Sequence, residues 1–238
     1  MRVLDCHPLA AAIRSRSSPH MSRTRIKICG MTRVEDALCA AHAGADAIGL
    51  IFYDASPRAV SIEQAMSISK VLPPFVSTVA LFVNALPNEV DKVISRLRPS
   101  VLQFHGDENA IYCAQFGMPF LKAIRVGART TTYDLLEYAS QFHAARALLL
   151  DTLSNTVYGG SGESFDWNVI PDVMRAHIVL SGGLQPANVA DAILTIRPWA
   201  VDVSSGVEVQ VDSNGAKGVK DHARIKKFIE EVRNADTS

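Results

Sequence analysis

Eight short apolar runs, each followed by an amphipathic stretch, alternate along the chain from Arg25 onward. The apolar runs have the length and β-branched content of strands, and the amphipathic stretches place apolar residues at helical spacing. The predicted strands cover 25–30, 45–53, 77–84, 100–106, 119–127, 145–152, 177–183 and 200–206, and the predicted helices cover 34–44, 61–72, 87–98, 107–117, 132–143, 167–175, 186–197 and 221–233. Strands that alternate with helices form parallel sheets through right-handed crossovers. Eight such units predict one α/β domain, a closed (β/α)8 TIM barrel over residues 25–238.

An open, doubly wound sheet is the alternative architecture. Such a sheet usually has a Gly-x-Gly-x-x-Gly turn after its first strand and an acidic residue about 20 positions later. Neither feature follows Ile28. Within the barrel prediction, Ser61 and Gln64 have the spacing of a capping box at the start of the second helix.

The first 24 residues have a different composition from the rest of the chain. They are rich in arginine and serine, lack periodicity and contain a single acidic residue, Asp5. We expect this extension to be disordered. A transit peptide and an extension upstream of Met21 both fit its composition.

Composition excludes several classes of protein. The 24 basic and 24 acidic side chains leave no net charge, so no global field would attract nucleic acid or an anionic membrane. No apolar run approaches the roughly 18 residues of a membrane span. Because Cys6, Cys29, Cys39 and Cys113 show no Cys-x-x-Cys or Cys/His ligand spacing, we expect no metal site and no disulfide framework. A reducing cytoplasm is the default location.

The active site of a barrel lies at the carboxyl ends of its strands. The residues expected there are Cys29, Phe52, Asn84, His105, Arg125, Asp151, Ser181 and Ser205. Cys29 and Asp151 end the first and sixth strands, on opposite sides of the mouth, and both can exchange protons when their surroundings tune them. A buried cysteine is often only a small apolar residue, whereas a carboxylate at the end of an apolar strand is costly unless it is used or paired.

Glycine-rich turns follow the last three predicted strands. They comprise Tyr158–Gly162, Ser181–Gly183 and Ser204–Gly206. Glycine lets backbone N–H groups approach an anion closely, and the loops after strands seven and eight are the usual phosphate site in such barrels. One such turn is often only a tight turn, but three at consecutive strand ends predict a phosphate site formed by Gly160, Gly162, Gly182, Gly183, Ser205 and Gly206.

Motifs at the strand ends resemble the signatures of the phosphoribosylanthranilate isomerase family. They are KICGMT at 27–32, SPR at 56–58, LQFHGD at 102–107, LDT at 150–152, GGSG at 159–162, FDW at 165–167, LSGGL at 180–184 and VDVSSGVE at 201–208. The resemblance extends from Arg25 to about Val232. It implies a cofactor-free barrel enzyme of tryptophan biosynthesis, whose small-molecule substrate is N-(5'-phosphoribosyl)anthranilate and whose reaction is an Amadori rearrangement.

The resemblance also implies residue roles. Asp151 matches the family's general acid and Cys29 its general base, and a thiol can act as a base when nearby positive charge favours the thiolate. Arg58 matches the arginine that would bind the anthranilate carboxylate through its planar fork. Packing in the core is the alternative for Cys29, and a solvated surface arginine is the alternative for Arg58.

Three further residues are kept as candidate substrate-binding residues. Gln103 and His105 either line the pocket or complete an inner layer of the barrel. Asp202 either contacts the substrate or pairs with Lys27, which we expect to point inward below Cys29. Arg125 either reaches the mouth or is turned outward by strand alternation, so it is not assigned.

The segment 209–219 departs from the family pattern, since it is longer than the usual Pro-Gly turn and lacks proline. Two other functions compete with the one implied: the related isomerase of histidine biosynthesis, which has an aspartate in place of Cys29 and a second phosphate site, and a phosphate-binding protein without catalysis. The sequence leaves open whether the chain is a monomer or a homodimer.

Overall fold

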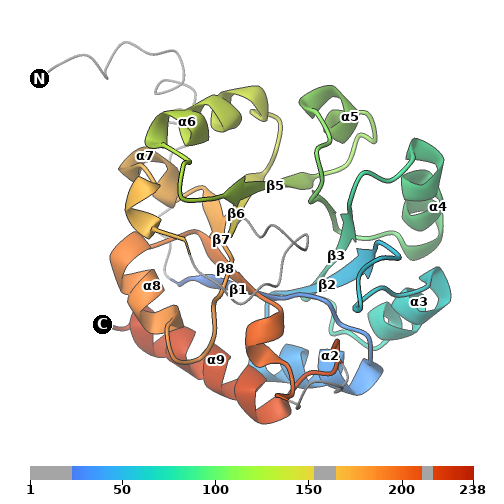
Figure 1. Ribbon diagram of the computed structural model, residues 1–238. Coiled ribbons are helices and arrows are strands. Elements are labelled where there is room, and N and C mark those ends of the chain that lie inside the picture. The colour runs from blue at the N-terminus through green and yellow to red at the C-terminus, as the bar shows by residue number, and fades with distance from the viewer. Residues whose placement is uncertain (1–22, 153–164, 211–216) are drawn as a thin grey trace, which may run out of the picture.

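The protein folds as a closed barrel of parallel strands inside a ring of helices (Figure 1). The computed structural model describes residues 23–152, 165–210 and 217–238. The strands are hydrogen-bonded in chain order from β1 to β8, and β8 pairs with β1 to close the sheet. The predicted TIM barrel is therefore confirmed, and the open sheet is excluded.

The barrel strands are short, and the helices differ widely in length. The strands are β1 (Arg25–Ile28), β2 (Ala47–Phe52), β3 (Ser77–Phe82), β4 (Val101–Phe104), β5 (Phe120–Val126), β6 (Ala147–Thr152), β7 (Ile178–Leu180) and β8 (Ala200–Val203). The helices are α2 (Val34–Ala43), α3 (Ile62–Lys70), α4 (Pro87–Leu97), α5 (Ala110–Ala114), α6 (Thr132–Gln141), α7 (Asp172–Arg175), α8 (Val189–Ile196) and α9 (His222–Asp236), with 3-10 turns η2 (Trp167–Val169) and η3 (Ser205–Val207).

Alternation along the strands decides which side chains face the barrel axis. On β6, Leu148 and Leu150 pack outward against the helices, whereas Ala147 and Leu149 belong to an apolar cluster inside the barrel. Asp151 continues this inward series at the carboxyl end of β6. The other strands follow the same rule. The base of the interior is apolar, and the mouth combines polar groups with an apolar cluster that includes Ile51 and Leu81.

The two ends of the described chain are tied together. The backbone N–H and hydroxyl of Thr24 donate to the carboxylate of Asp236, at the end of α9. Arg23 forms an ion pair with Asp46, which also accepts the N–H of Ile26. Residues 23 and 24 thus bind the barrel directly, and the rest of the predicted extension lies outside the described residues.

Two local predictions need correction. The helix predicted over 167–175 is instead η2 followed by the single turn α7, because Pro171 lacks an N–H donor and disfavours a helical residue before it. The Ser61 hydroxyl does accept the N–H of Gln64, but the Gln64 side chain donates to the carbonyl of Thr32 and not back to Ser61. The reciprocal half of the capping box is therefore replaced by a link between α3 and the loop after β1.

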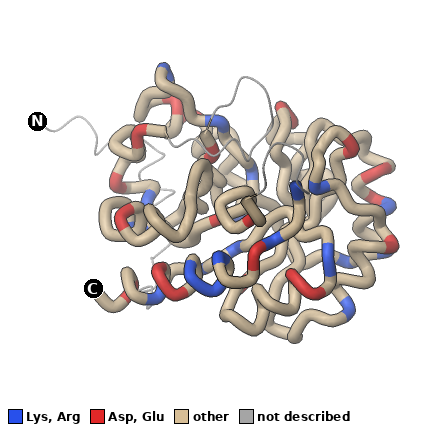
Figure 2. Tube along the Cα trace, turned by 60° about the horizontal axis from the view of Figure 1, so that its bottom comes forward, with Lys and Arg blue, Asp and Glu red and all other residues tan. Residues whose placement is uncertain are grey.

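Charged residues of both signs are interspersed along the trace, in keeping with a net charge of zero (Figure 2). Among the described residues, no helix is both long and apolar enough to cross a membrane.

Candidate active site

The carboxyl ends of the strands surround a small pocket at the barrel mouth. Its volume is about 50 Å³. The lining residues come from β2, β3, β4, β6 and β8 and from the adjoining loops, including Cys29 just after β1: Cys29, Ile51, Tyr53, Ser56, Arg58, Leu81, Val83, Gln103, His105, Asp151, Ser181, Asp202 and Ser204. The structure therefore brings together Cys29, Asp151 and all four candidate substrate-binding residues predicted from the sequence. Tyr53, Ser56 and Ser204 were not predicted.

Cys29 lies beside a buried ion pair. Lys27 Nζ is 2.8 Å from Asp202 Oδ1, and both side chains are buried, which confirms the predicted pair. Lys27 and Asp202 are register partners across β1 and β8, so both point inward at the same height. A β carbon placed on Gly49 would lie 2.6 Å from Cys29 Sγ and 3.1 Å from Lys27 Nζ. The thiol and the ammonium thus share the space that a side chain at position 49 would fill.

The surroundings of Cys29 act on its proton in opposite directions. Burial raises the pKa of the thiol and is the largest influence, whereas the positive charges of Lys27 and Lys220 lower it and Asp202 raises it further. Burial also opposes the charge on Lys27, but Asp202 and Cys29 outweigh it and raise the pKa of the ammonium. Lys27 therefore stays charged beside the thiol.

Asp151 is held by neighbours on two sides. Its Oδ1 accepts the backbone N–H of Thr152 at 3.0 Å, and its Oδ2 lies 3.1 Å from His105 Nε2. The other ring nitrogen of His105 is 3.0 Å from Nε2 of Gln103, whose side chain is fully buried. The structure thus places Gln103 and His105 in a hydrogen-bonded chain that ends on Asp151.

Arg58 is fixed by a carboxylate that the sequence reasoning missed. Its Nε and Nη2 donate to Glu208 Oε1 and Oε2 at 2.6 and 2.8 Å. Lys220 Nζ also donates to Glu208 Oε1, at 3.0 Å. Burial opposes the charge on Glu208, but Arg58 and Lys220 outweigh it and lower the pKa of the carboxylate. In the described part of the chain Nη1 of Arg58 makes no hydrogen bond. Part of the guanidinium therefore remains available at the pocket.

The loops after β7 and β8 pack closely against each other. A β carbon on Gly206 would lie 1.9 Å from the carbonyl oxygen of Leu184, and one on Gly182 would lie 2.2 Å from Thr152 Oγ1. Gly182 and Gly183 also have positive φ angles. A side chain at position 182 or 206 would therefore collide with a neighbouring segment, and position 182 also has a backbone conformation that favours glycine. Packing alone thus explains glycine at both positions, whether or not a ligand binds there.

Two predicted features fall partly or wholly outside the described residues. Gly160 and Gly162 belong to the undescribed segment after β6. The segment 209–219 is described only at its ends, where Val209 N donates to Val219 O and Glu208 forms an antiparallel bridge with Lys220. Its two ends therefore meet beside Arg58.

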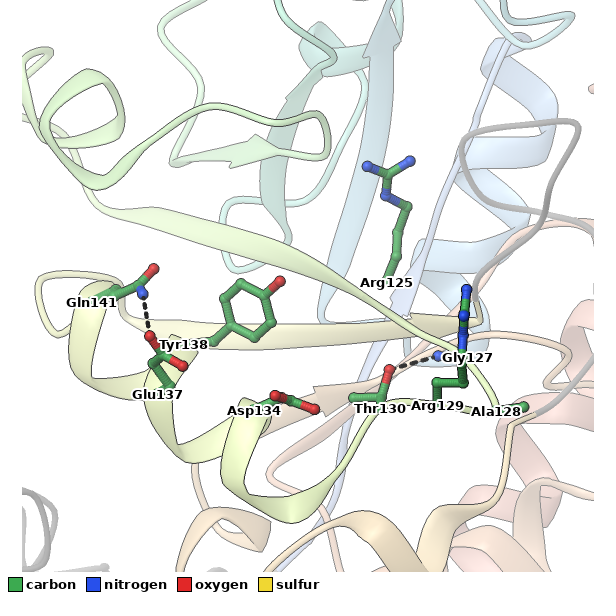
Figure 3. A pocket seen from close by; sticks show the side chains of 9 residues that line it. All are labelled: Arg125, Gly127, Ala128, Arg129, Thr130, Asp134, Glu137, Tyr138 and Gln141. Carbon is green, nitrogen blue, oxygen red and sulfur yellow. Dashed lines mark hydrogen bonds between the residues drawn. The ribbon is translucent and has the colours of Figure 1, made fainter.

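A larger cavity, of about 700 Å³, lies between the end of β5 and helix α6, as Figure 3 shows. It is lined by Arg125, Arg129 and polar side chains of α6, including Glu137 and Gln141, which are hydrogen-bonded to each other. Neither Cys29 nor Asp151 reaches it. We take the smaller pocket as the candidate site because the groups able to move protons line it.

The direction of Arg125, which the sequence left open, is inward. Arg125 follows Leu121 and Ala123 on the inward face of β5 and forms an ion pair with Asp107 after β4.

Among the described residues, no group of three or more His, Cys, Asp or Glu side chains is placed to hold a metal ion. Cys29, Cys39 and Cys113 are free thiols.

The fold and the site define an α/β-barrel in which a thiol and a carboxyl group line one pocket at the strand ends. The family model for N-(5'-phosphoribosyl)anthranilate (PRA) isomerase matches residues 26–231. The chain belongs to this family, and it is an isomerase.

Similar proteins support this membership. An N-(5'-phosphoribosyl)anthranilate isomerase of Methylibium petroleiphilum is 50% identical over 214 residues, which cover 90% of this chain and 96% of that one. One from Pseudomonas fluorescens Pf0-1 is 50% identical over 213 residues, covering 90% and 100%. The crystal structure of phosphoribosyl anthranilate isomerase from Thermotoga maritima is 43% identical, with a TM-score of 0.77 over 89% of this chain and 99% of that one.

Proposed function

We propose that this isomerase converts N-(5'-phosphoribosyl)anthranilate into 1-(2-carboxyphenylamino)-1-deoxyribulose 5-phosphate, with Cys29 as general base and Asp151 as general acid. The observation that carries the proposal is the placement of these two groups at the ends of β1 and β6, facing one pocket. A solved isomerase of this family, 39% identical with a TM-score of 0.72, was crystallised with the reduced form of that product.

The rearrangement needs an acid and a base on different sides of the sugar. The proton of Asp151 is transferred to the ribose ring oxygen, and the ring opens to a Schiff base. Cys29 then removes the proton from C2', which gives an enolamine that tautomerises to the ketone. Asp151 and Cys29 are buried, with 3% and 4% of their surfaces exposed, so proton transfer would occur in a site shielded from water.

The substrate phosphate is proposed to bind at the loops after β7 and β8. Within the described part of the chain, the backbone N–H groups of Gly182, Gly183, Ser205 and Gly206 donate to no protein acceptor. Unsatisfied backbone donors at a glycine-rich turn suit a dianion. Gly160 and Gly162 stay part of the proposed phosphate site as a prediction.

At the other end of the substrate, Arg58 is proposed to bind the anthranilate carboxylate. Glu208 already occupies one edge of its guanidinium, which fixes the plane of the group and leaves Nη1 for the substrate. Gln103, His105 and Asp202 are proposed to line the sugar-binding part of the pocket.

The remaining proposals concern context. A cytoplasmic location, no cofactor and no nucleic-acid partner follow from the resemblance and the composition. The Thermotoga maritima enzyme is described as dimeric in one solved structure, and this chain is proposed to be either a monomer or a homodimer, which sedimentation would distinguish.

The test of the function is the change in anthranilate fluorescence when substrate is added to purified protein. Cys29→Ser and Asp151→Asn should each lose about two to four decades in kcat. With a substrate analogue that is already ring-opened, Asp151→Asn should regain much of its activity and Cys29→Ser should not. A folded Cys29→Ala variant with near-normal turnover would show that the thiol only packs, and an inactive wild-type protein would leave a phosphate-binding function in its place.

A further inference from the structure

The buried charges around Cys29 do not cancel. Lys27 and Asp202 form one neutral pair at the base of the pocket. Arg58 and Glu208 form a second neutral pair at its rim. Lys220 then adds a further positive charge, because its ammonium shares Glu208 with Arg58 and forms no ion pair with another carboxylate in the described part of the chain. When ionised, the three cations and two carboxylates of this cluster together carry one net positive charge. A thiolate at Cys29 would balance that charge. The backbone N–H of Lys220 donates to the buried Asp36, whose other oxygen lies 2.9 Å from His222 Nε2.

The Lys220 ammonium is shielded from solvent and hydrogen-bonded only to protein groups. Its side chain is fully buried, and its ammonium donates to Glu208 Oε1 at 3.0 Å and to the Ser204 carbonyl at 3.0 Å. The Ser204 hydroxyl is a third, longer contact at 3.5 Å. An ammonium has three donors, so this position satisfies all of them while holding the charge away from water.

The hydrogen bonds of Lys220 to Ser204 place its ammonium at the carboxyl end of β8, next to Cys29. Ser204 follows Val203, whose carbonyl oxygen accepts the N–H of Cys29 at 2.8 Å. Ser204 also lines the same pocket as Cys29 and Arg58. In a buried setting, charges interact over longer distances than in water because the effective dielectric constant is lower. The ammonium therefore acts on the thiol without touching it.

We propose that Lys220 is a positioning residue for the reaction: its buried ammonium supplies the unbalanced positive charge against which Cys29 becomes a thiolate, while Glu208 limits that charge. The inference rests on the proposed role of Cys29 as the base. Consistent with it, Lys220 is among the groups that lower the pKa of Cys29, and Cys29 raises that of Lys220, although burial makes the net pKa of Lys220 lower than usual.

Other ionisable groups face the same pocket and are left unchanged in the test. They are Tyr53 after β2, His105 on the β4 end and Asp151 on β6. A change in the titration of Cys29 on altering Lys220 or Glu208 alone would thus report the charge balance of this cluster.

The experiment measures the rate of alkylation of Cys29 by iodoacetamide against pH, with peptide mass spectrometry to separate it from the other cysteines. Lys220→Met should move the midpoint upward by about one pH unit, so that alkylation at pH 7 falls roughly tenfold. Glu208→Gln should move it downward, and the double variant should return towards the wild type. Lys220→Arg, which keeps the charge, should stay close to the wild type.

Two controls separate charge from structure. Cys39, on the outer helix α2, gives an internal reference in every digest. Lys227→Met removes the same charge from the exposed surface of α9 and should leave the titration of Cys29 unchanged. In turnover, Lys220→Met should shift the pH dependence of kcat/KM upward and still approach the wild-type plateau, whereas damage to packing would lower the plateau itself.

An unchanged alkylation midpoint in Lys220→Met would overturn the inference. An upward shift of the midpoint in Glu208→Gln would overturn it as well, and this variant still gives a result if Lys220→Met fails to fold. The outcome is also distinct from that for the proposed function. If the thiol responds as expected but Cys29→Ser turns over normally, the charge balance stands and the role of Cys29 as base fails.

Discussion

The imidazole of His105 lies between Asp151 and Gln103, with Nε2 3.1 Å from Asp151 Oδ2 and Nδ1 3.0 Å from the Gln103 amide. With the Gln103 NH2 group facing Nδ1, Nδ1 accepts this hydrogen bond when the imidazole carries its proton on Nε2, the nitrogen that faces Asp151. Whichever tautomer is present, the ring fixes the carboxyl group that is proposed to protonate the sugar.

Replacement of His105 by leucine should therefore lower kcat by about one to two decades, because groups that orient a reacting side chain typically contribute this much. His105→Gln, which keeps a polar contact to Asp151, should retain more activity than His105→Leu. Steady-state assays on both variants, with circular dichroism to confirm folding, would test this. Equal activity in the two variants would show that the ring only fills space.

The pH dependence of turnover should follow the environment of Cys29. Burial raises the pKa of the Cys29 thiol above its ordinary value, so the thiolate fraction should grow as the pH increases from neutral. A base must be unprotonated to act, so kcat/KM should rise as the pH increases through the neutral range. A profile that is flat or falls between about pH 6 and 8 would contradict the assignment.

Gly49→Ala should impair the site more than the fold. The new methyl group would lie 2.6 Å from Cys29 Sγ and 3.1 Å from Lys27 Nζ, so one or both must move. We expect kcat to fall at least about tenfold, since small displacements of reacting groups are costly. Gly117→Ala is a matched control: its methyl group would meet no atom within 4 Å, but its φ of +64° makes alanine strained. This control should lower the unfolding temperature and leave kcat unchanged.

Arg58→Lys should weaken substrate binding while leaving the sugar chemistry largely intact. Lysine keeps the charge but cannot hold Glu208 with one edge and a carboxylate with the other. The expected result is a rise in KM of about tenfold with a smaller change in kcat. Unchanged kinetics for Arg58→Ala would exclude the carboxylate-binding role.

The ion pair between Lys122 and Glu108 should contribute to stability and not to catalysis. Lys122 Nζ is 2.9 Å from Glu108 Oε2, both are buried, and Glu108 also accepts the backbone N–H groups of Asn84 and Gly106. Removal of one partner leaves a buried charge unpaired, so Lys122→Met should cost about 3–5 kcal/mol in the free energy of unfolding. Denaturant titration measures this, and a loss below about 1 kcal/mol would contradict the expectation.

The sequence predicted most of the fold because alternation and helical spacing repeat eight times with little ambiguity. It also placed Cys29, Asp151 and the Lys27–Asp202 pair correctly in the barrel, since inward positions follow from counting along a strand. It missed Glu208 as the partner of Arg58 and Lys220 as the second partner of Glu208. These residues lie in loops whose contacts join positions 150 and 12 residues apart, and no periodic pattern encodes such contacts.

The direction of Arg125 stayed open for a similar reason. The pairing of β5 with β6 sets Arg125 opposite Asp151, whose side chain lines the pocket. Only the observed pairing of neighbouring strands fixes that choice, because a shift of one residue exchanges the two faces of a strand.

The bond between Thr24 and Asp236, with the pairing of β1 and β8, has a consequence for how the protein is made. The first strand leaves the ribosome early, but it must wait for the last strand and helix before its edge is covered. Cys29, which follows β1, therefore lacks Asp202, Glu208 and Lys220 until nearly the whole chain has emerged. During synthesis the proposed base therefore lacks the charged groups that surround it in the folded protein. The active site forms only when β8 pairs with β1 and closes the barrel.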